Sequence, residues 1–322
     1  MMMEVVPNIF LVKLPLPFRL DHVNCYLLKG KNGWSIIDAG LNYPPSTGIW
    51  EKTFKDLGLK YSDIEGIYLT HLHPDHYGAS GWLQVLTGAP VYMNRTESIN
   101  VEQIWKKGRT IVPVVGELFK ENGMPPSLIS DVLDSMVEIW KAIQPHPTIS
   151  LLPEGEKIEL SGRLFEVIHT PGHSDGHISF FNEDEGILIS GDHLLPKISS
   201  NVSLWPTSHP NPLELFMNSL EKTGEMPVKL VLPAHGPYFT NCSGRVDELL
   251  AHHRERLARI EEMTGNGASA YQICVKLFGT DLTLHEIRFA LMETLAHLAY
   301  LESRSKVASR QEGGIVMYRK VA

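Results

Sequence analysis

A segment of six residues, His71-Leu72-His73-Pro74-Asp75-His76, contains three imidazole rings and one carboxylate. Imidazole and carboxylate groups suit zinc, iron and manganese. His71 and His73 alternate along the chain and can bind one cation, whereas Asp75 and His76 can turn toward a second. Unrelated histidines that happen to lie near a turn would not explain so dense a cluster.

Three further candidate ligands occupy the same kind of position as His71, after a short apolar run and a turn residue. They are His173, Asp192 and His235. Short apolar runs bounded by turn residues predict buried strands, and loops that follow strands commonly carry reactive groups. We therefore expect four strand ends to bring these residues to the motif at 71–76.

The candidate ligands predict a site for two divalent metal ions. Zinc is expected, with iron or manganese as alternatives, because no thiolate is among the candidates. Two metals about 3.5–4 Å apart polarise a carbonyl or phosphoryl oxygen and provide a bridging hydroxide at neutral pH. No nucleophilic serine or cysteine is then needed. We expect Asp75 to orient the hydroxide and to carry a proton to the leaving group.

The surrounding sequence alternates predicted strands and helices, which is typical of helices packed outside sheets. The apolar runs 24–28 and 34–37 flank Asn32-Gly33, a strong hairpin signal. Helices are expected at 49–57, 81–86 and 212–223. Further strands are expected at 8–14, 67–69, 90–93, 165–168, 178–181, 187–189 and 230–232.

Two segments differ in composition from the rest. Residues 97–148 are predicted to be a helical insertion, in which Trp105, Met136 and Trp140 either line a pocket over the metals or pack between helices. Beyond residue 240 the pattern predicts three helices, the second of them over 268–278, and a terminal hairpin.

The HxHxDH motif at 71–76, with the three later candidates, resembles the metallo-beta-lactamase superfamily over about residues 4–240. The resemblance implies an α/β fold, an αββα sandwich of two mixed β-sheets, in a catalytic domain at 1–240. It implies that Asp38 supports a ligand histidine and fixes its tautomer. It also implies a ligand set in which His71, His73 and His173 hold one metal, Asp75, His76 and His235 hold the other, and Asp192 bridges them.

Residues 245–322 resemble the winged-helix-like C-terminal domain of the lactamase-like protein 2 and glyoxalase II-like branch. That branch includes a single-strand endoribonuclease, so nucleic acid is an alternative partner. A basic cluster lies near the predicted wing, with Glu312 as the one acid against it. The overall charge of −8, concentrated in residues 1–244, does not favour a nucleic acid. We expect a structural tail that shields the pocket or forms a homodimer contact. The basic cluster comprises Arg304, Lys306, Arg310, Arg319 and Lys320.

These features predict a hydrolase of a small ester, thioester or lactone, because the insertion could roof an apolar acyl pocket. No counterpart is evident of the basic cluster that grips glutathione in glyoxalase II. The alternatives are an endonuclease that cleaves single-stranded RNA with the same two metals, and a metal-stabilised protein without catalytic activity. A beta-lactamase is poorly motivated without an export signal, and a flavodiiron oxidoreductase would need a flavin domain.

Composition bounds these predictions. The chain has 322 residues, of which 43% are hydrophobic and 20% charged, so it is expected to fold into one large or two ordinary domains. No apolar run is long enough for a membrane span, and residues 1–14 lack a signal-peptide pattern, so we expect a cytoplasmic protein. Cys25, Cys242 and Cys274 have no paired spacing and are expected to be small apolar fillers.

Overall fold

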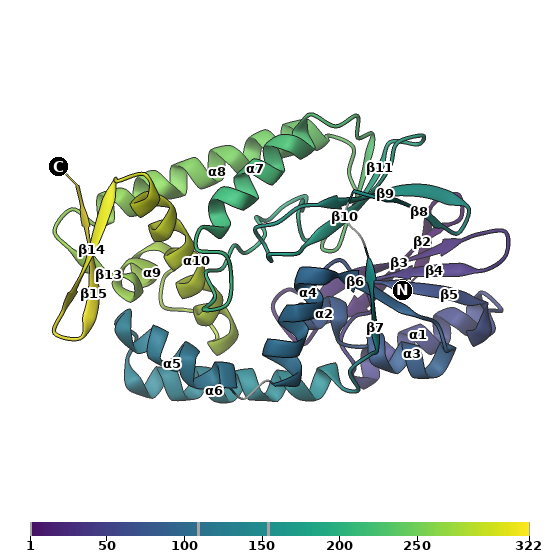
Figure 1. Cartoon of the computed structure of the whole chain (residues 1–322), viewed down its shortest axis with the longest axis horizontal. Helices are drawn as coiled ribbons and strands as arrows, with labels where there is room; N and C mark the ends of the chain where they lie inside the picture. The colour runs from purple at the N-terminus through teal and green to yellow at the C-terminus, as the bar shows by residue number, and fades with distance from the viewer. Residues whose placement is uncertain (1, 108–109, 153–154, 322) are drawn as a thin grey trace.

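The computed structural model describes residues 2–107, 110–152 and 155–321 (Figure 1). Two mixed β-sheets face each other, and helices cover their outer faces. The predicted αββα sandwich of two mixed sheets is therefore confirmed.

The first sheet contains seven strands in sequence order. Strands β1 to β4 run antiparallel to their neighbours, whereas β4 to β7 are mutually parallel. The turn at Asn32-Gly33 joins β3 to β4, as predicted. The strands are β1 (Met2–Val6), β2 (Ile9–Pro15), β3 (His22–Lys29), β4 (Trp34–Ile37), β5 (Ile64–Tyr68), β6 (Val91–Asn94) and β7 (Ile149–Leu152).

The second sheet contains five strands in the order β12-β11-β10-β9-β8. Only the β11–β12 pair is parallel. The strands are β8 (Lys157–Leu160), β9 (Arg163–His169), β10 (Ile178–Asn182), β11 (Ile187–Gly191) and β12 (Leu230–Pro233).

An apolar layer joins the two sheets. Tyr26 and Leu28 on β3 are buried in the same cluster as Phe165 on β9 and Phe180 on β10. Alternate residues of a strand point to opposite faces of a sheet, so the neighbours of these residues pack outward under the helices. Burial on both faces stabilises the sandwich and leaves its strand ends as rigid supports for the site.

The helices fall into three sets. The first set lies outside the first sheet and contains α1 (Pro44–Asp56), η1 (Tyr61–Asp63), α2 (Pro74–Tyr77) and α3 (Ser80–Thr87). The second set lies between β6 and β7 and contains α4 (Arg95–Asn100), the π-helical turn η2 (Val101–Lys106), α5 (Ile111–Glu121), α6 (Pro126–Ile139) and η4 (Trp140–Ile143). The third set contains α7 (Pro212–Gly224), α8 (Cys242–Met263), α9 (Ala270–Phe278) and α10 (Leu284–Ser303).

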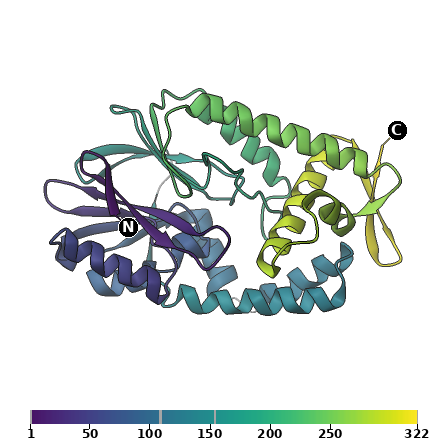
Figure 2. The same ribbon diagram turned by 180° about the vertical axis from the view of Figure 1, so that it is seen from behind.

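The helices between β6 and β7 extend away from the sandwich and pack against the C-terminal part of the chain. Val115 and Phe119 on α5 and Val132 on α6 are buried in the same apolar cluster as Leu291 and Leu295 on α10. Figures 1 and 2 show α5 and α6 along one side of the molecule and α8 along the other, both ending at the C-terminal helices. These helices therefore have no separate core.

The C-terminal part combines three helices with a three-stranded antiparallel sheet, β13-β15-β14. Its strands are β13 (Ala268–Ser269), β14 (Val307–Glu312) and β15 (Ile315–Lys320). The helix predicted at 268–278 begins at Ala270 instead, because the Ser269 side chain accepts the Gln272 N–H and caps the helix. The winged-helix assignment and the domain limits at 240 and 245 stay predictions.

Other differences from the sequence analysis lie at element boundaries. Strands β1, β7 and β8 were not predicted, since they carry no long apolar run. Helix α1 begins at Pro44, ahead of the expected start at 49, because proline is tolerated in the first turn of a helix. The three cysteines are buried and unpaired, as expected. Within the described residues, no helix is both long enough and apolar enough to span a membrane.

Candidate metal centre

The loops after four strands meet at one edge of the sandwich. His71 follows β5, His173 follows β9, Asp192 follows β11 and His235 follows β12. The loop after β5 continues into the short helix α2, whose first turn carries Asp75 and His76. All seven predicted metal ligands are thereby brought together in two groups.

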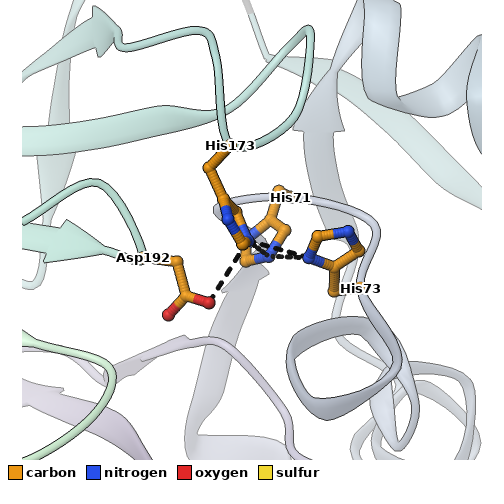
Figure 3. A group of neighbouring side chains, drawn as sticks. All are labelled: His71, His73, His173 and Asp192. Carbon is orange, nitrogen blue, oxygen red and sulfur yellow. Dashed lines mark hydrogen bonds and ion pairs between the residues drawn. The ribbon is translucent and has the colours of Figure 1, made fainter. Parts of the chain in front are cut away.

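The first group contains His71, His73, His173 and Asp192 (Figure 3). His73 Nδ1 lies 2.9 Å from His71 Nε2 and 2.8 Å from His173 Nε2, and the two Nε2 atoms lie 3.2 Å apart. Asp192 Oδ2 approaches His173 Nε2 to 3.3 Å from the opposite side. Three imidazole nitrogens and a carboxylate oxygen thus surround one point.

The second group contains Asp75, His76 and His235. Asp75 Oδ2 lies 3.4 Å from His235 Nε2 and 3.7 Å from His76 Nε2. The other oxygen of Asp192, Oδ1, lies 3.2 Å from His235 Nε2 and 3.5 Å from His76 Nε2. Asp192 therefore presents one oxygen to each group.

Three atoms of these groups test whether the residues fit a cation. His76 Nε2, His235 Nε2 and Asp192 Oδ1 are buried, and none makes a hydrogen bond within the described chain. Buried polar atoms without a partner are rare because each costs free energy. A divalent cation would satisfy all three, so the residues fit a metal at this position.

Backbone carbonyls hold the outer nitrogens of two of the histidines, so that their Nε2 atoms point to the centre of each group. His173 Nδ1 donates to the Asn201 carbonyl at 2.7 Å, and His235 Nδ1 donates to the His22 carbonyl at 2.7 Å. A donor at Nδ1 places the lone pair of a neutral imidazole on Nε2. Burial, followed by the nearby His173, lowers the pKa of His73 to about 3, which keeps that ring neutral.

Asp38 supports the second group from behind. Its Oδ2 accepts a hydrogen bond from His76 Nδ1 at 2.8 Å, and its Oδ1 accepts the Thr70 N–H at 2.8 Å. Asp38 has a φ of +59°, a left-handed conformation that aspartate tolerates. The predicted position of Asp38 beside a candidate ligand is thus observed, and its effect on the metal stays a proposal.

A glycine permits the close approach of one ligand loop. Gly191 has a φ of +53°, and a Cβ there would lie 2.7 Å from His177 Nε2 and 3.0 Å from Thr70. The same His177 Nε2 accepts the Asp192 N–H at 3.1 Å. Any larger residue at 191 would displace Asp192, and His177 serves as packing and support rather than as a member of either group.

The sequence analysis missed Glu97, which is fully buried at the start of α4. Its carboxylate accepts the N–H of Leu72 at 2.8 Å and the N–H of Gly176 at 2.7 Å. It therefore ties the loop that carries His71 and His73 to the loop that carries His173. Burial raises the pKa of Glu97 to about 7, against the lowering effect of these backbone donors. A lone Glu before a helical segment gave no signal of this role.

Three other buried side chains with titratable groups lie outside the two groups. Tyr77 is fully buried and bonds His146 at 2.9 Å, so it does not face the site. His193 is buried and bonds Thr223 at 2.8 Å. His253 is fully buried on α8 and bonds Ser199 at 3.0 Å.

A cavity of about 900 Å³ opens over the candidate ligands. Trp105, Met136 and Trp140 line it, as one of the two alternatives predicted, and they also pack against the apolar clusters. Trp105 also donates its Nε1–H to the Leu72 carbonyl at 2.9 Å. The roof of the cavity therefore contacts the motif loop directly.

The C-terminal helices close another side of the same cavity. Phe278 on α9, His285 and Phe289 on α10 line it. On α10, Glu293 accepts a hydrogen bond from the Asn201 side chain at 2.8 Å, and the Asn201 carbonyl holds His173. The expected shielding of the pocket is observed, whereas a homodimer contact stays a prediction.

The basic cluster near the terminal hairpin is more neutralised than the sequence suggested. Glu312 was expected to be its one acidic neighbour, and Arg319 does pair with it. Arg304 also pairs with Glu214 at 2.5 Å, and Lys320 pairs with Glu261 at 2.8 Å. The expectation was wrong because Glu214 and Glu261 are distant in sequence and reach the cluster through folding.

Comparisons with known proteins agree with this architecture. Residues 18–235 match the Metallo-beta-lactamase superfamily, and residues 257–321 match the Metallo-beta-lactamase-like, C-terminal domain. A "Probable metallo-hydrolase" of Bacillus subtilis is 27% identical over 97% of this chain and 98% of its own length. An "Atrochrysone carboxyl ACP thioesterase" of Paecilomyces divaricatus is 23% identical over 74% of this chain and 58% of its own.

A solved structure is similar over the whole length. The metallo-beta-lactamase family protein from Thermus thermophilus superposes with a TM-score of 0.90 at 32% identity, over 99% of this chain and 100% of its own. The match includes the helices between β6 and β7 and the C-terminal part. The fold, the two groups of histidine and aspartate and these similarities together show that the chain belongs to the metallo-beta-lactamase superfamily.

Proposed function

We propose that the protein is a hydrolase that binds two divalent metal ions, most simply zinc, and cleaves an ester, thioester or lactone of a small acyl compound. The observation that carries this proposal is that two ligand groups, joined by Asp192, lie beneath an apolar cavity. His71, His73 and His173 would hold one ion, and Asp75, His76 and His235 the other. When bound, the ions would polarise the substrate carbonyl and supply a water-derived nucleophile at neutral pH.

Asp75 is suited to move a proton during this reaction. It lines the cavity, whereas His71 and His76 are fully buried. Burial opposes ionisation of Asp75, yet His76 and His235 together hold the pKa of its carboxyl below the usual range. The ionised carboxylate can accept a proton from the attacking water and return it to the departing oxygen or sulfur.

The walls of the cavity favour an acyl substrate over a nucleic acid. Apolar and aromatic side chains bind an acyl chain and exclude bulk water from the reacting carbonyl. The thioesterase name of one relative supports the thioester among the three bond types. The phosphodiester alternative draws no support from the C-terminal surface, where Arg304, Arg319 and Lys320 already pair with carboxylates.

The proposal is tested by assaying the metal-loaded protein on acyl thioesters, esters and lactones, with labelled single-stranded RNA as the competing substrate. We expect turnover of a carbonyl substrate that a chelator abolishes and that Asp75→Asn lowers by about 10²–10⁴-fold. The Asp75→Asn variant should keep its circular dichroism spectrum and its Tm.

Asp247→Asn is the matched control, because Asp247 is exposed on α8. It should keep the activity of the parent protein. RNA cleavage without carbonyl hydrolysis would replace the proposal with the nuclease alternative. Full activity of Asp75→Asn would refute the proton-transfer role.

A further inference from the structure

Arg288 on α10 lies in the wall of the cavity, and it is a buried cation without an ion pair among the residues that the structure describes. The residue is only 7% exposed. Arginine is almost never buried to this extent without a paired anion. Its position therefore needs a physical explanation.

The surroundings of Arg288 orient the guanidinium group but do not neutralise it. The group lies 4.6 Å from the centre of the Phe289 ring and 5.9 Å from that of Trp205. One Nη atom lies 3.3 Å from His285 Nδ1, while Nε is buried and lacks a hydrogen bond within the described chain. Stacking on aromatic rings holds the planar guanidinium and leaves its donors directed outward from the rings.

No acidic neighbour on the same helix is available to Arg288. Glu293 pairs with Arg256 and accepts the Asn201 side chain. Glu286 caps the start of α10 at Thr283 and approaches Arg19 at 3.5 Å. Both carboxylates that line the cavity from this helix therefore already have partners.

The charge state of the pair Arg288–His285 also leaves room for an anion. Burial lowers the pKa of Arg288 to about 10, so the side chain is still protonated at neutral pH. Burial, followed by Arg288, lowers the pKa of His285 to about 4, so that ring is neutral. Within the described chain, no carboxylate forms an ion pair with this protonated guanidinium.

A buried charge that lacks a partner is costly, and a bound oxyanion removes that cost. On the basis of the hydrolase function proposed above, we propose that the substrate carries an anionic group, a carboxylate or a phosphate, that binds Arg288 while its scissile carbonyl lies at the candidate metal ligands. Arg288 and these ligands line the same cavity, and apolar side chains such as Met136 and Trp140 line the wall around them. The preferred substrate is thus an acyl compound with an apolar body and an anionic end.

The anion can belong to the acyl part or to the leaving group, and two pairs of substrates distinguish these sources. The first pair is a short-chain acyl thioester with a terminal carboxylate and its counterpart with a terminal methyl group. The second pair is an acyl thioester of phosphopantetheine and the same thioester of pantetheine. We expect one pair to show a preference of about 10- to 100-fold in kcat/KM for its anionic member, the range of a charged hydrogen bond.

Arg288→Met tests whether this preference depends on the guanidinium. The variant should lose the preference, through KM, while it hydrolyses the neutral member of each pair within about threefold of the parent rate. Arg288→Lys should restore part of the preference, because lysine keeps the charge but not the planar donor pair. Arg254→Met is the control, since Arg254 is exposed on α8 and approaches Glu221 at 3.8 Å; it should leave the preference intact.

Stability distinguishes ligand binding from a structural role. Methionine fills a similar volume and removes a buried charge, so Arg288→Met should keep or raise the Tm of the protein. A marked fall in Tm, with the preference unchanged, would show that Arg288 stabilises the fold instead. A preference that survives in Arg288→Met, or no preference in either pair, would also overturn the proposal.

A binding measurement decides the matter even if none of these substrates is cleaved. Metal-loaded protein is titrated with straight-chain dicarboxylates of increasing length and with monocarboxylates of equal length, and the fluorescence of Trp105, Trp140 and Trp205 in the cavity wall is followed. Both ligand types can place one carboxylate at the metals, but only dicarboxylates reach Arg288 as well. Arg288→Met should lower the affinity for the tightest-binding dicarboxylate by about tenfold or more, and it should leave the affinity for monocarboxylates unchanged. Equal affinities for the two types, in parent and variant alike, would refute the anion site.

Discussion

The floor and the roof of the cavity are built on opposite principles. The floor is built by the seven candidate ligands, five of which line the cavity; they follow four strands of the sandwich and are held by hydrogen bonds. The roof comes from η2, α6, η4, α10 and the segment before α7 that carries Trp205, and it is mostly aromatic and aliphatic. The floor residues that line the cavity are His73, Asp75, His173, Asp192 and His235, with the fully buried His71 and His76 behind them, and the main roof residues are Ile104, Trp105, Met136, Trp140, Trp205 and Phe289.

This difference separates chemistry from recognition. Each floor position makes a directional contact, so a single replacement leaves a buried polar group or a metal without its partner. The roof acts through the area it removes from water, which is shared among many side chains. Substitutions in the floor should therefore change kcat and metal content, whereas substitutions in the roof should change KM.

The largest effect is expected in the floor, for His235→Ala. Loss of its Nε2, which faces Asp75 and Asp192, should remove one metal and lower kcat by about 10³-fold or more, equivalent to about 4 kcal/mol. Metal analysis of the purified variant and steady-state kinetics measure the two quantities. His252→Ala is the control, because His252 lies on α8 outside both groups, and it should retain two metals. A His235→Ala variant with full metal content and activity would break the division between floor and roof.

The next largest effect is expected for Glu97, which supports the floor from below, and it depends on pH. The pKa of Glu97 is raised to about 7 in the folded protein from an ordinary 4.5, so between these values the folded state holds a proton that the unfolded state has released. Its contribution to the free energy of unfolding is therefore full at low pH and is lost, by about 3 kcal/mol, as the pH rises through that window. Glu97→Gln removes this dependence.

The measurement is denaturant unfolding of the metal-free parent and variant at several pH values between 4.5 and 7.5. It gives one curve of unfolding free energy against pH for each protein, and the difference between these two curves tests the prediction. Groups shared by both proteins cancel in this difference. Glu159→Gln, at an exposed position of β8, should follow the parent at every pH. Parallel curves for Glu97→Gln and the parent would contradict the prediction.

A smaller effect is expected for Asp38→Asn. Asparagine tolerates the left-handed backbone at this position, but it is a neutral and weaker acceptor for the His76 Nδ1–H. Metal affinity or kcat should fall by about 10- to 100-fold, with little change in KM. Asp56→Asn, which alters an exposed pair with Lys52, should leave both unchanged. Unaltered metal affinity in Asp38→Asn would show that the floor does not rely on this contact.

The smallest effect is expected in the roof, for Trp140→Leu. Loss of part of the aromatic wall should raise KM for an acyl substrate by roughly tenfold, about 1.4 kcal/mol, with kcat nearly constant. Trp82→Leu provides a matched control, since Trp82 is also half-buried but lies on α3, away from the cavity. A fall in kcat without a change in KM would show that Trp140 acts in the chemical step, as the floor residues are expected to do, rather than in substrate binding.

The floor could be predicted because its information is local. HxHxDH at 71–76 carries four of the seven candidates, and the other three each follow a short apolar run that predicts a strand. Once the runs are strands of two facing sheets, their ends must meet. The strands themselves were predictable in the buried middle of each sheet, whereas β1, β7 and β8 at or near the edges carry weaker patterns.

The remaining support could not be predicted because it depends on contacts between distant segments. Glu97 has no distinguishing neighbour in the sequence, and its role arises only when α4 lies beside the loops at Leu72 and Gly176. Glu214 on α7 and Glu261 on α8 pair with basic side chains of the cluster near the terminal hairpin. Isolated charged residues look alike in a sequence until folding assigns their partners.

The sequence by itself determined the candidate metal centre of this protein, because the identity and spacing of the seven candidate ligands follow from short motifs and the strands before them. Only the tertiary structure decided the shape and charge of the cavity above this centre. The roof joins the helices between β6 and β7 to α10, and the buried cation of Arg288 faces the cavity only through that packing. Metal ligation depends on a few directional bonds that a local pattern can encode, whereas the shape and charge of a cavity depend on the packing of segments far apart in the chain.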